Sequence, residues 1–160
     1  MIMQKTNSMR TPPAGKKRGI AGVTMLELLI VLAIISIIAS FAYPSYLDYV
    51  GRAKRTAATA TLLQISDKQQ QFFMDRKSYT SDLTDLGYVS DPLIISDDGT
   101  TSIATDPQSI YTIALSGVAT TTYVITAVPL HGQLQRDSEC GSLTLDQAGN
   151  RGSDGIDCWN

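Results

Sequence analysis

One acidic side chain, Glu27, lies at the start of a long apolar segment. The next 20 residues, 28–47, contain no charged side chain, and the next cation, Arg52, is too far along a helix to pair with it. A cut after Gly22 would give Val23 a new α-amino group, which is largely protonated at neutral pH and would lie one helical turn before Glu27. The sequence therefore predicts a charge pair created by cleavage, within one subunit or between neighbouring subunits.

The other reactive side chains do not form a catalytic pattern. The single histidine, His131, is predicted to lie on a surface loop. Asp146, Asp154 and Asp157, with Asn150 between them, could supply oxygen ligands to Ca²⁺, but the EF-hand spacing is absent and these side chains could equally be solvated in turns. Because there is also no glycine-rich phosphate loop, we expect no enzymatic activity, no cofactor and no metal.

The apolar segment has the length of a membrane-spanning helix. At 1.5 Å per residue, residues 28–47 would extend about 30 Å, which is the thickness of a bilayer core. Residues 1–22 contain five basic and no acidic side chains, so the positive-inside rule places them in the cytoplasm. Two alternatives are a secretory signal cut after Ala42 and an uncleaved signal anchor, although Glu27 would interrupt the apolar core of a secretory signal.

The charge of the chain changes along its length. After residue 22 there are 8 basic and 15 acidic residues, a net charge of −7, which argues against nonspecific DNA binding. Arg52, Lys54 and Arg55 form a basic cluster just beyond the apolar segment. We expect this cluster to be a solvated helix face or to contact lipid headgroups, with acidic surfaces of neighbouring subunits as a further option.

The helix is predicted to continue past Pro44, which should kink it, to about residue 75. Two sets of residues recur at spacings of three and four: Tyr46, Val50, Ala53, Ala57 and Ala60; and Ala58, Leu62, Ile65, Gln69 and Phe72. Turn signals dominate residues 76–108, with a short helical turn within 79–87. Period-two and β-branched patterns then predict strands at residues 110–116, 121–130 and 142–145. The predicted fold is α+β, with a long N-terminal helix packed on a small antiparallel sheet.

Two cysteines, Cys140 and Cys158, lie near the C-terminus, without CxxC spacing. If the apolar segment exports the rest of the chain, one disulfide becomes the default in an oxidising compartment, and two buried thiols are the alternative.

The junction between the basic stretch and the apolar run resembles the class III signal of type IV prepilins. Gly22 matches the glycine before the cut, Thr24 the threonine and Glu27 the glutamate of that signal, whereas Val23 replaces the usual phenylalanine. The resemblance implies that a prepilin peptidase cleaves the Gly22–Val23 bond and methylates the amine of Val23.

The C-terminal region resembles PilE-like minor pilins. The matching residues are Ala127–Pro129, Gln133, Asp137, Cys140–Gly141, Leu143–Asp146, Gly149 and Cys158–Trp159. The resemblance implies that Cys140 and Cys158 close a disulfide-bounded loop used for subunit contact or recognition.

Together these resemblances imply a minor subunit of a type IV pilus that supports pilus biogenesis, twitching motility and adhesion. It would span the inner membrane once, with a cytoplasmic N-terminus and a periplasmic C-terminal domain, before it enters the extracellular pilus. Its partners would be other pilin subunits, prepilin peptidase, the inner-membrane assembly machinery and the membrane, and nucleic acid is not expected. Alternatives are a type II secretion pseudopilin and a pilus-borne subunit that binds DNA or a surface receptor. The predicted segments are a leader (1–22), a membrane and filament-core half-helix (23–47), an amphipathic half-helix (48–75) and a globular region (76–160).

Overall fold

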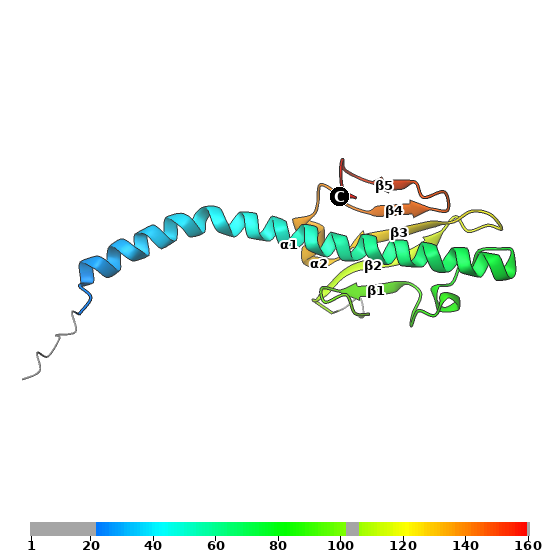
Figure 1. The fold of residues 1–160 in the computed structure, drawn as a ribbon, viewed down its shortest axis with the longest axis horizontal. Coiled ribbons are helices and arrows are strands. Elements are labelled where there is room, and N and C mark those ends of the chain that lie inside the picture. The colour runs from blue at the N-terminus through cyan, green and yellow to red at the C-terminus, as the bar shows by residue number, and fades with distance from the viewer. Residues whose placement is uncertain (1–21, 102–105, 160) are drawn as a thin grey trace, which may run out of the picture. The chain divides into compact units, whose positions relative to one another are not determined.

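The computed structural model describes residues 22–101 and 106–159 (Figure 1). The chain divides into two compact units, of which the first ends at Ile38 and the second begins at Ala39. The leader prediction falls almost entirely on residues 1–21, which lie outside the described part.

Helix α1 comprises Met25–Arg76, close to the predicted bounds. Its first turn is capped by Thr24, because the Thr24 hydroxyl accepts a hydrogen bond from the backbone N–H of Glu27 at 3.2 Å. Pro44 lies inside this helix, and the kink there remains a prediction. In the described residues, α1 is the one helix long and apolar enough to cross a membrane.

The second unit contains a five-stranded antiparallel sheet in the order β1-β2-β3-β4-β5. The strands are β1 (Leu93–Ser96), β2 (Ser109–Ser116), β3 (Val124–Pro129), β4 (Leu143–Asp146) and β5 (Arg151–Ser153). The three predicted strands are confirmed as β2, β3 and β4. The sequence did not predict β1, a four-residue strand flanked by turn residues, or β5, whose central glycine has low strand propensity.

Two short helices complete the unit. The 3₁₀ helix η1 (Leu83–Leu86) confirms the predicted helical turn, and Asp82 caps it by accepting a hydrogen bond from Thr84 N. The prediction that His131 lies on a loop is wrong, because His131 begins helix α2 (His131–Arg136). With six residues, one of them glycine, and no side-chain cap at Leu130, α2 carries little local signal.

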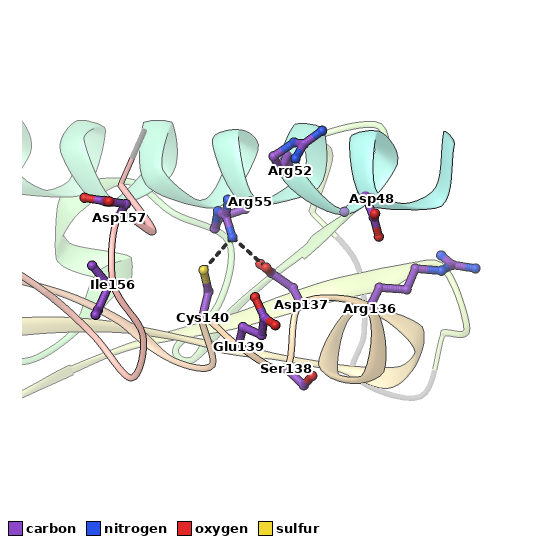
Figure 2. Close-up of a pocket in the computed structure, with 11 residues that line it drawn as sticks. Asp48, Arg52, Arg55, Arg136, Asp137, Ser138, Glu139, Cys140, Ile156 and Asp157 are labelled. Carbon is purple, nitrogen blue, oxygen red and sulfur yellow. Dashed lines mark hydrogen bonds and ion pairs between the residues drawn. The ribbon is translucent and has the colours of Figure 1, made fainter. Parts of the chain in front are cut away.

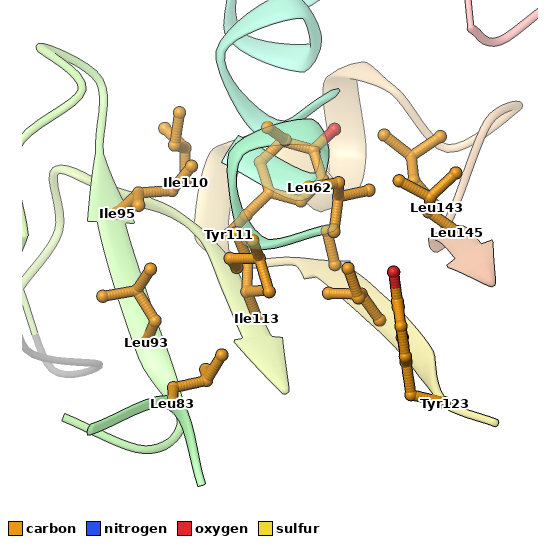
Figure 3. Close-up of a cluster of buried hydrophobic side chains, with 14 of the residues drawn as sticks. Leu62, Leu83, Leu93, Ile95, Ile110, Tyr111, Ile113, Tyr123, Leu143 and Leu145 are labelled. Atoms are coloured by element: carbon orange, nitrogen blue, oxygen red, sulfur yellow. The ribbon is translucent and has the colours of Figure 1, made fainter. Parts of the chain in front are cut away.

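The core of this unit lies between α1 and the sheet. One stripe of α1 is buried at spacings of three and four: Gly51, Arg55, Ala58, Leu62, Ile65 and Gln69. Leu62 is fully buried in the same cluster as Tyr111 and Ile113 of β2 (Figure 3). The second predicted set therefore faces the core, whereas Tyr46, Ala53 and Ala60 of the first set are exposed.

Candidate functional site

The apolar start of α1 is exposed in the part of the chain that the structure describes. Every residue from 22 to 46 is exposed, and the large apolar side chains among them reach 85% exposure at Met25. An uncovered apolar surface of this length requires lipid or other protein chains around it. Glu27 lies in the first turn, where the helix dipole favours a negative charge.

The sites at Gly22, Val23 and Glu27 are placed together at this end of α1. Gly22 and Val23 precede the helix in an exposed, non-helical segment, and no other side chain would hinder a Cβ atom at Gly22. The Gly22–Val23 bond is therefore exposed and lies outside the helix. Cleavage, methylation of Val23 and the charge pair with Glu27 remain predictions.

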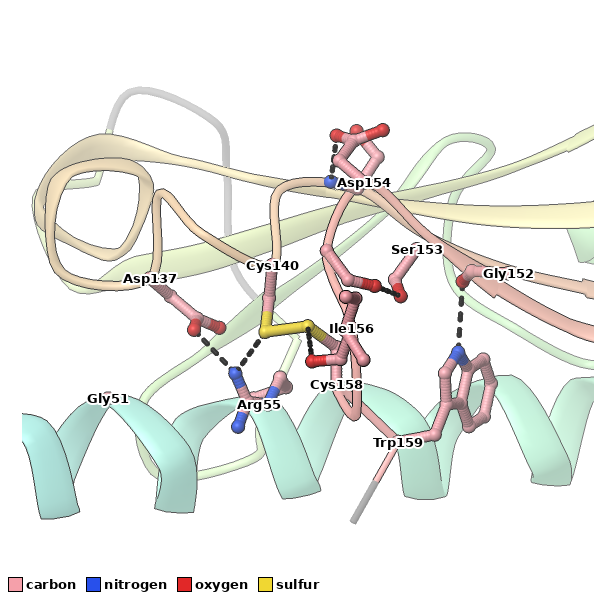
Figure 4. The surroundings of a disulfide bond; sticks show 12 residues. Gly51, Arg55, Asp137, Cys140, Gly152, Ser153, Asp154, Ile156, Cys158 and Trp159 are labelled. Carbon is pink, nitrogen blue, oxygen red and sulfur yellow. Dashed lines mark hydrogen bonds and ion pairs between the residues drawn. A yellow bond between two sulfur atoms is a disulfide. The ribbon is translucent and has the colours of Figure 1, made fainter.

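The structure joins the two cysteines. Cys140 and Cys158 form a disulfide with a Cα–Cα distance of 5.5 Å, as predicted (Figure 4). Cys140 precedes β4 and Cys158 follows β5, so the bond encloses the hairpin of these two strands. Trp159 extends the same region, where its indole N–H donates to Gly152 O at 2.9 Å and Arg151 lies 5.3 Å above its ring.

A buried ion pair connects this loop to α1. Arg55 Nη1 lies 2.6 Å from Asp137 Oδ1, both side chains are less than a tenth exposed, and the same nitrogen faces Cys140 Sγ (Figures 2 and 4). The expectation that Arg55 belongs to a solvated basic face is therefore wrong. The sequence could have predicted that Arg55 is buried, because Arg55 precedes Ala58 by three positions on the buried stripe of α1. A buried cation in turn needs an acidic partner.

The ion pair is the centre of a larger polar network. The Tyr111 hydroxyl donates to Asp137 Oδ2 at 3.2 Å, and the Gln133 amide donates to Gly51 O at 3.1 Å as well as facing Tyr111 and Asp137. Burial raises the pKa of Tyr111, although its hydrogen bond with Gln133 opposes that change. The network thus fixes α2 and the disulfide loop against α1. The sequence placed Gln133 and Asp137 in a family motif but gave them no role.

The rest of the predicted basic cluster is divided between two environments. Lys54 lies 3.6 Å from Asp97, in a partly exposed ion pair, whereas Arg52 is exposed. The cluster is therefore three separate cations and not one basic face.

The acidic residues near the C-terminus serve different turns. Asp146 accepts hydrogen bonds from Asn150, which hold the pKa of Asp146 below its usual range, and Asp154 accepts from Ser142 N at 2.9 Å. Over residues 22–101 and 106–159, no group of three or more His, Cys, Asp or Glu side chains is arranged to hold a metal ion.

Two family models match this chain, over residues 17–43 and 44–144. A family model described as type IV minor pilin ComP, DNA uptake sequence receptor, matches residues 44–144, which is more than half of the chain. A model of the prokaryotic N-terminal methylation motif matches residues 17–43. No curated protein matches the sequence.

One solved structure similar to this chain is the non-core minor pilin PilV of Neisseria meningitidis. It is 16% identical, the match covers 69% of this chain and 92% of that one, and the TM-score is 0.46. The apolar helix, the methylation motif and the family match over residues 44–144 agree with one another. The chain therefore belongs to the type IV minor pilin ComP family.

Proposed function

We propose that this minor pilin is cut after Gly22, methylated on Val23 and drawn into a type IV pilus through the apolar start of α1. The uncovered apolar surface of residues 22–46 carries the proposal, because the same surface suits a bilayer before assembly and neighbouring helices afterwards. The leader stays in the cytoplasm, and the second unit is periplasmic until the subunit reaches the extracellular filament. The subunit supports pilus biogenesis, and through it twitching motility and adhesion.

Substitution of Gly22 tests the cleavage site. We expect Gly22→Ser to leave an uncut precursor in the membrane fraction, whereas Gly19→Ser, within the leader, should be processed normally. Mass spectrometry of the mature protein should find an N-methylated Val23 at its start. A mature chain that begins at Tyr43 would instead identify an ordinary signal peptide.

Glu27 is proposed to pair with the methylated amine of a neighbouring Val23 during assembly. The pair neutralises a carboxylate that would otherwise be costly in an apolar surrounding. We expect Glu27→Ala to insert and to be cleaved, but to be depleted from sheared pili, because the membrane does not require the pair and the filament does. Asp75→Ala, an exposed acid elsewhere on α1, is the control. Pili that contain normal amounts of the Glu27→Ala subunit would refute the role.

DNA binding is a second candidate function, and the description of the matching family model supports it. The net charge of −7 after residue 22 requires any DNA contact to be local. A gel-shift experiment with the full chain should compare genomic fragments with shuffled sequences over a range of salt concentrations. If the chain recognises a DNA sequence, it should bind the genomic fragments more tightly than the shuffled ones at every salt concentration. Equal binding of the genomic and the shuffled fragments would mean that the chain makes nonspecific phosphate contacts.

A further inference from the structure

We propose that Cys140 is the cysteine that reacts first when the disulfide of this protein forms, and that its reaction partner is a protein oxidant with an exchangeable disulfide of its own. In this proposal Arg55 is a positioning residue that stabilises the thiolate of Cys140, and Cys158 completes the bond afterwards. The inference goes beyond the proposed function, because it concerns the second unit alone and does not require entry into a pilus.

The two sulfur atoms of the disulfide lie in different electrostatic environments (Figure 4). Arg55 Nη1 is within hydrogen-bonding distance of Cys140 Sγ, whereas Ile156 O lies 3.4 Å from Cys158 Sγ. A guanidinium group stabilises a thiolate, because it donates a charge-assisted hydrogen bond to the sulfur. A carbonyl oxygen repels a thiolate and accepts a hydrogen bond from a neutral thiol. Before the bond exists, the negative charge is therefore favoured on Cys140.

Asp137 shares the guanidinium group of Arg55 without occupying all of its donors. Asp137 Oδ1 lies 2.6 Å from the same nitrogen, Nη1. Asp137 Oδ2 accepts hydrogen bonds from the Tyr111 hydroxyl at 3.2 Å and from the Gln133 amide at 3.3 Å, so its negative charge is distributed over several donors. Because a guanidinium has five N–H groups, Arg55 can serve the carboxylate and a Cys140 thiolate together.

Other acidic groups near the sulfurs do not explain the difference between them. Glu139 directly precedes Cys140 and Asp157 directly precedes Cys158, so each cysteine has one acidic neighbour in the chain. Both of these acidic side chains are exposed, and water and salt screen their charges. The asymmetry between the sulfurs therefore comes from Arg55 on one side and a backbone oxygen on the other.

Cys140 is held against α1 by residues that come before it in the chain. Its backbone N–H and that of Gly141 both donate to Asp137 O at 3.1 Å, and the Asp137 side chain is fixed by Arg55. Part of the cover over Cys140 comes from later residues, since Asp154 N donates to Cys140 O at 3.2 Å. The Cys140 sulfur can thus be in place beside Arg55, and accessible, while the last hairpin is still open.

The proposed reaction is a two-step thiol–disulfide exchange. The Cys140 thiolate attacks one sulfur of the oxidant's disulfide, so that a bond forms between the two proteins and the oxidant's other sulfur leaves as a thiolate. Cys158 then loses its proton and attacks Cys140 Sγ, which forms the Cys140–Cys158 bond and releases the oxidant's first sulfur. The two cysteines lose two electrons and two protons, and the oxidant takes up both.

The pH dependence of thiol reactivity tests the assignment in the full chain in detergent micelles. Cys158→Ser leaves only Cys140 to react, and Cys140→Ser leaves only Cys158. Each variant is mixed with the uncharged disulfide dithiodipyridine, and the rate is followed from pH 5 to pH 10 by absorbance of the released thiopyridone. The plateau rate reports access to the sulfur, whereas the pH of half-maximal rate reports formation of the thiolate. We expect this midpoint to lie about one pH unit lower for Cys140 than for Cys158, an about 10-fold larger thiolate fraction at neutral pH.

Variants of the ion pair, made in the Cys158→Ser chain, separate electrostatics from packing. Arg55→Met should raise the midpoint of Cys140 by about one pH unit, and Arg55→Lys should restore part of the shift because it keeps the positive charge. Asp137→Asn should leave the midpoint low or lower it further, because it frees Arg55 for the sulfur, although it destabilises the unit. Arg76→Met removes an arginine from the last turn of α1 and should change nothing.

Near-ultraviolet circular dichroism verifies that each variant is folded. If Arg55→Met alone does not fold, Arg55→Met/Asp137→Asn removes both charges together and should show the same raised midpoint. Equal midpoints for the two single-cysteine chains would overturn the proposal, as would a midpoint for Cys140 that Arg55→Met leaves unchanged or that Asp137→Asn raises.

The reduced chain with both cysteines provides an independent test. It is mixed briefly with glutathione disulfide, quenched with acid and analysed by peptide mass spectrometry. We expect the first glutathione adduct mainly on Cys140. An adduct mainly on Cys158 would reverse the order of the two steps and refute the role of Arg55.

Discussion

Replacement of Asp137 by asparagine should destabilise the second unit, because it leaves a buried cation without a counter-charge. Asparagine has nearly the same volume, and its side-chain oxygen can still accept a hydrogen bond from Tyr111. What is lost is the charge that faces Arg55 at 2.6 Å, in a pair of side chains that are 9% and 8% exposed. The variant therefore isolates electrostatics from packing.

The expected loss is about 3 kcal/mol, which is the lower end for removal of one partner from a buried ion pair. The second unit contains about 120 residues, for which the entropy of unfolding is about 0.25 kcal/mol per kelvin. The loss should therefore lower the melting temperature by about 12 °C. Thermal unfolding of the full chain in detergent micelles, followed by near-ultraviolet circular dichroism, measures this change.

Two further variants make the prediction refutable. Asp97→Asn removes the exposed partner of Lys54 and should change stability by less than about 1 kcal/mol. Arg55→Met combined with Asp137→Asn removes both buried charges and should be more stable than Asp137→Asn alone. If Asp137→Asn melts like the unmodified protein, the prediction is refuted. If the double variant loses as much stability as Arg55→Met and Asp137→Asn lose together when measured singly, the uncompensated cation is not the cause of the destabilisation.

Three other perturbations address the same unit. Burial raises the pKa of the Tyr111 hydroxyl, so the unfolded state loses the hydroxyl proton at a lower pH than the folded state does. The free energy of unfolding should therefore fall as the pH rises above about 10. Tyr111→Phe should reduce that fall in melting curves recorded at several pH values. Gly141 has φ +53°, and a Cβ atom there would overlap the side chain of Asp154. Gly149 has φ +82° but open space around it. Gly141→Ala should therefore lower the melting temperature more than Gly149→Ala does. Cys140→Ser should cost about 3 kcal/mol by the same measurement, provided that thiol labelling verifies the loss of the disulfide.

The elements of this fold that depend on local pattern were predictable from the sequence. α1 follows from apolar residues at spacings of three and four, and β2, β3 and β4 follow from period-two and β-branched residue patterns. The disulfide followed from the two cysteines and the expected compartment. The helix and these three strands depend on residue patterns that are complete within one short segment of the chain.

The elements that depend on distant partners were not predictable. β5 has the sequence Arg151-Gly152-Ser153 and is a strand because β4 supplies its hydrogen bonds. The ion pair joins residues 82 positions apart, so no local pattern could identify Asp137 as the partner of Arg55. Helix α2 similarly depends on contacts with α1 and β2.

The order of the strands in the sheet has a consequence for how this protein acquires its disulfide. Each strand pairs with the next one in the sequence, so the sheet can grow in chain order as the polypeptide emerges, and β5 is the last to be added. Because Cys140 precedes β4 and Cys158 comes after β5, pairing of this hairpin brings the sulfur atoms together. We therefore expect oxidation to be a late step that closes a nearly complete sheet. With two cysteines in the whole chain, the disulfide error open to this protein is a bond between two copies whose last hairpin has not yet formed.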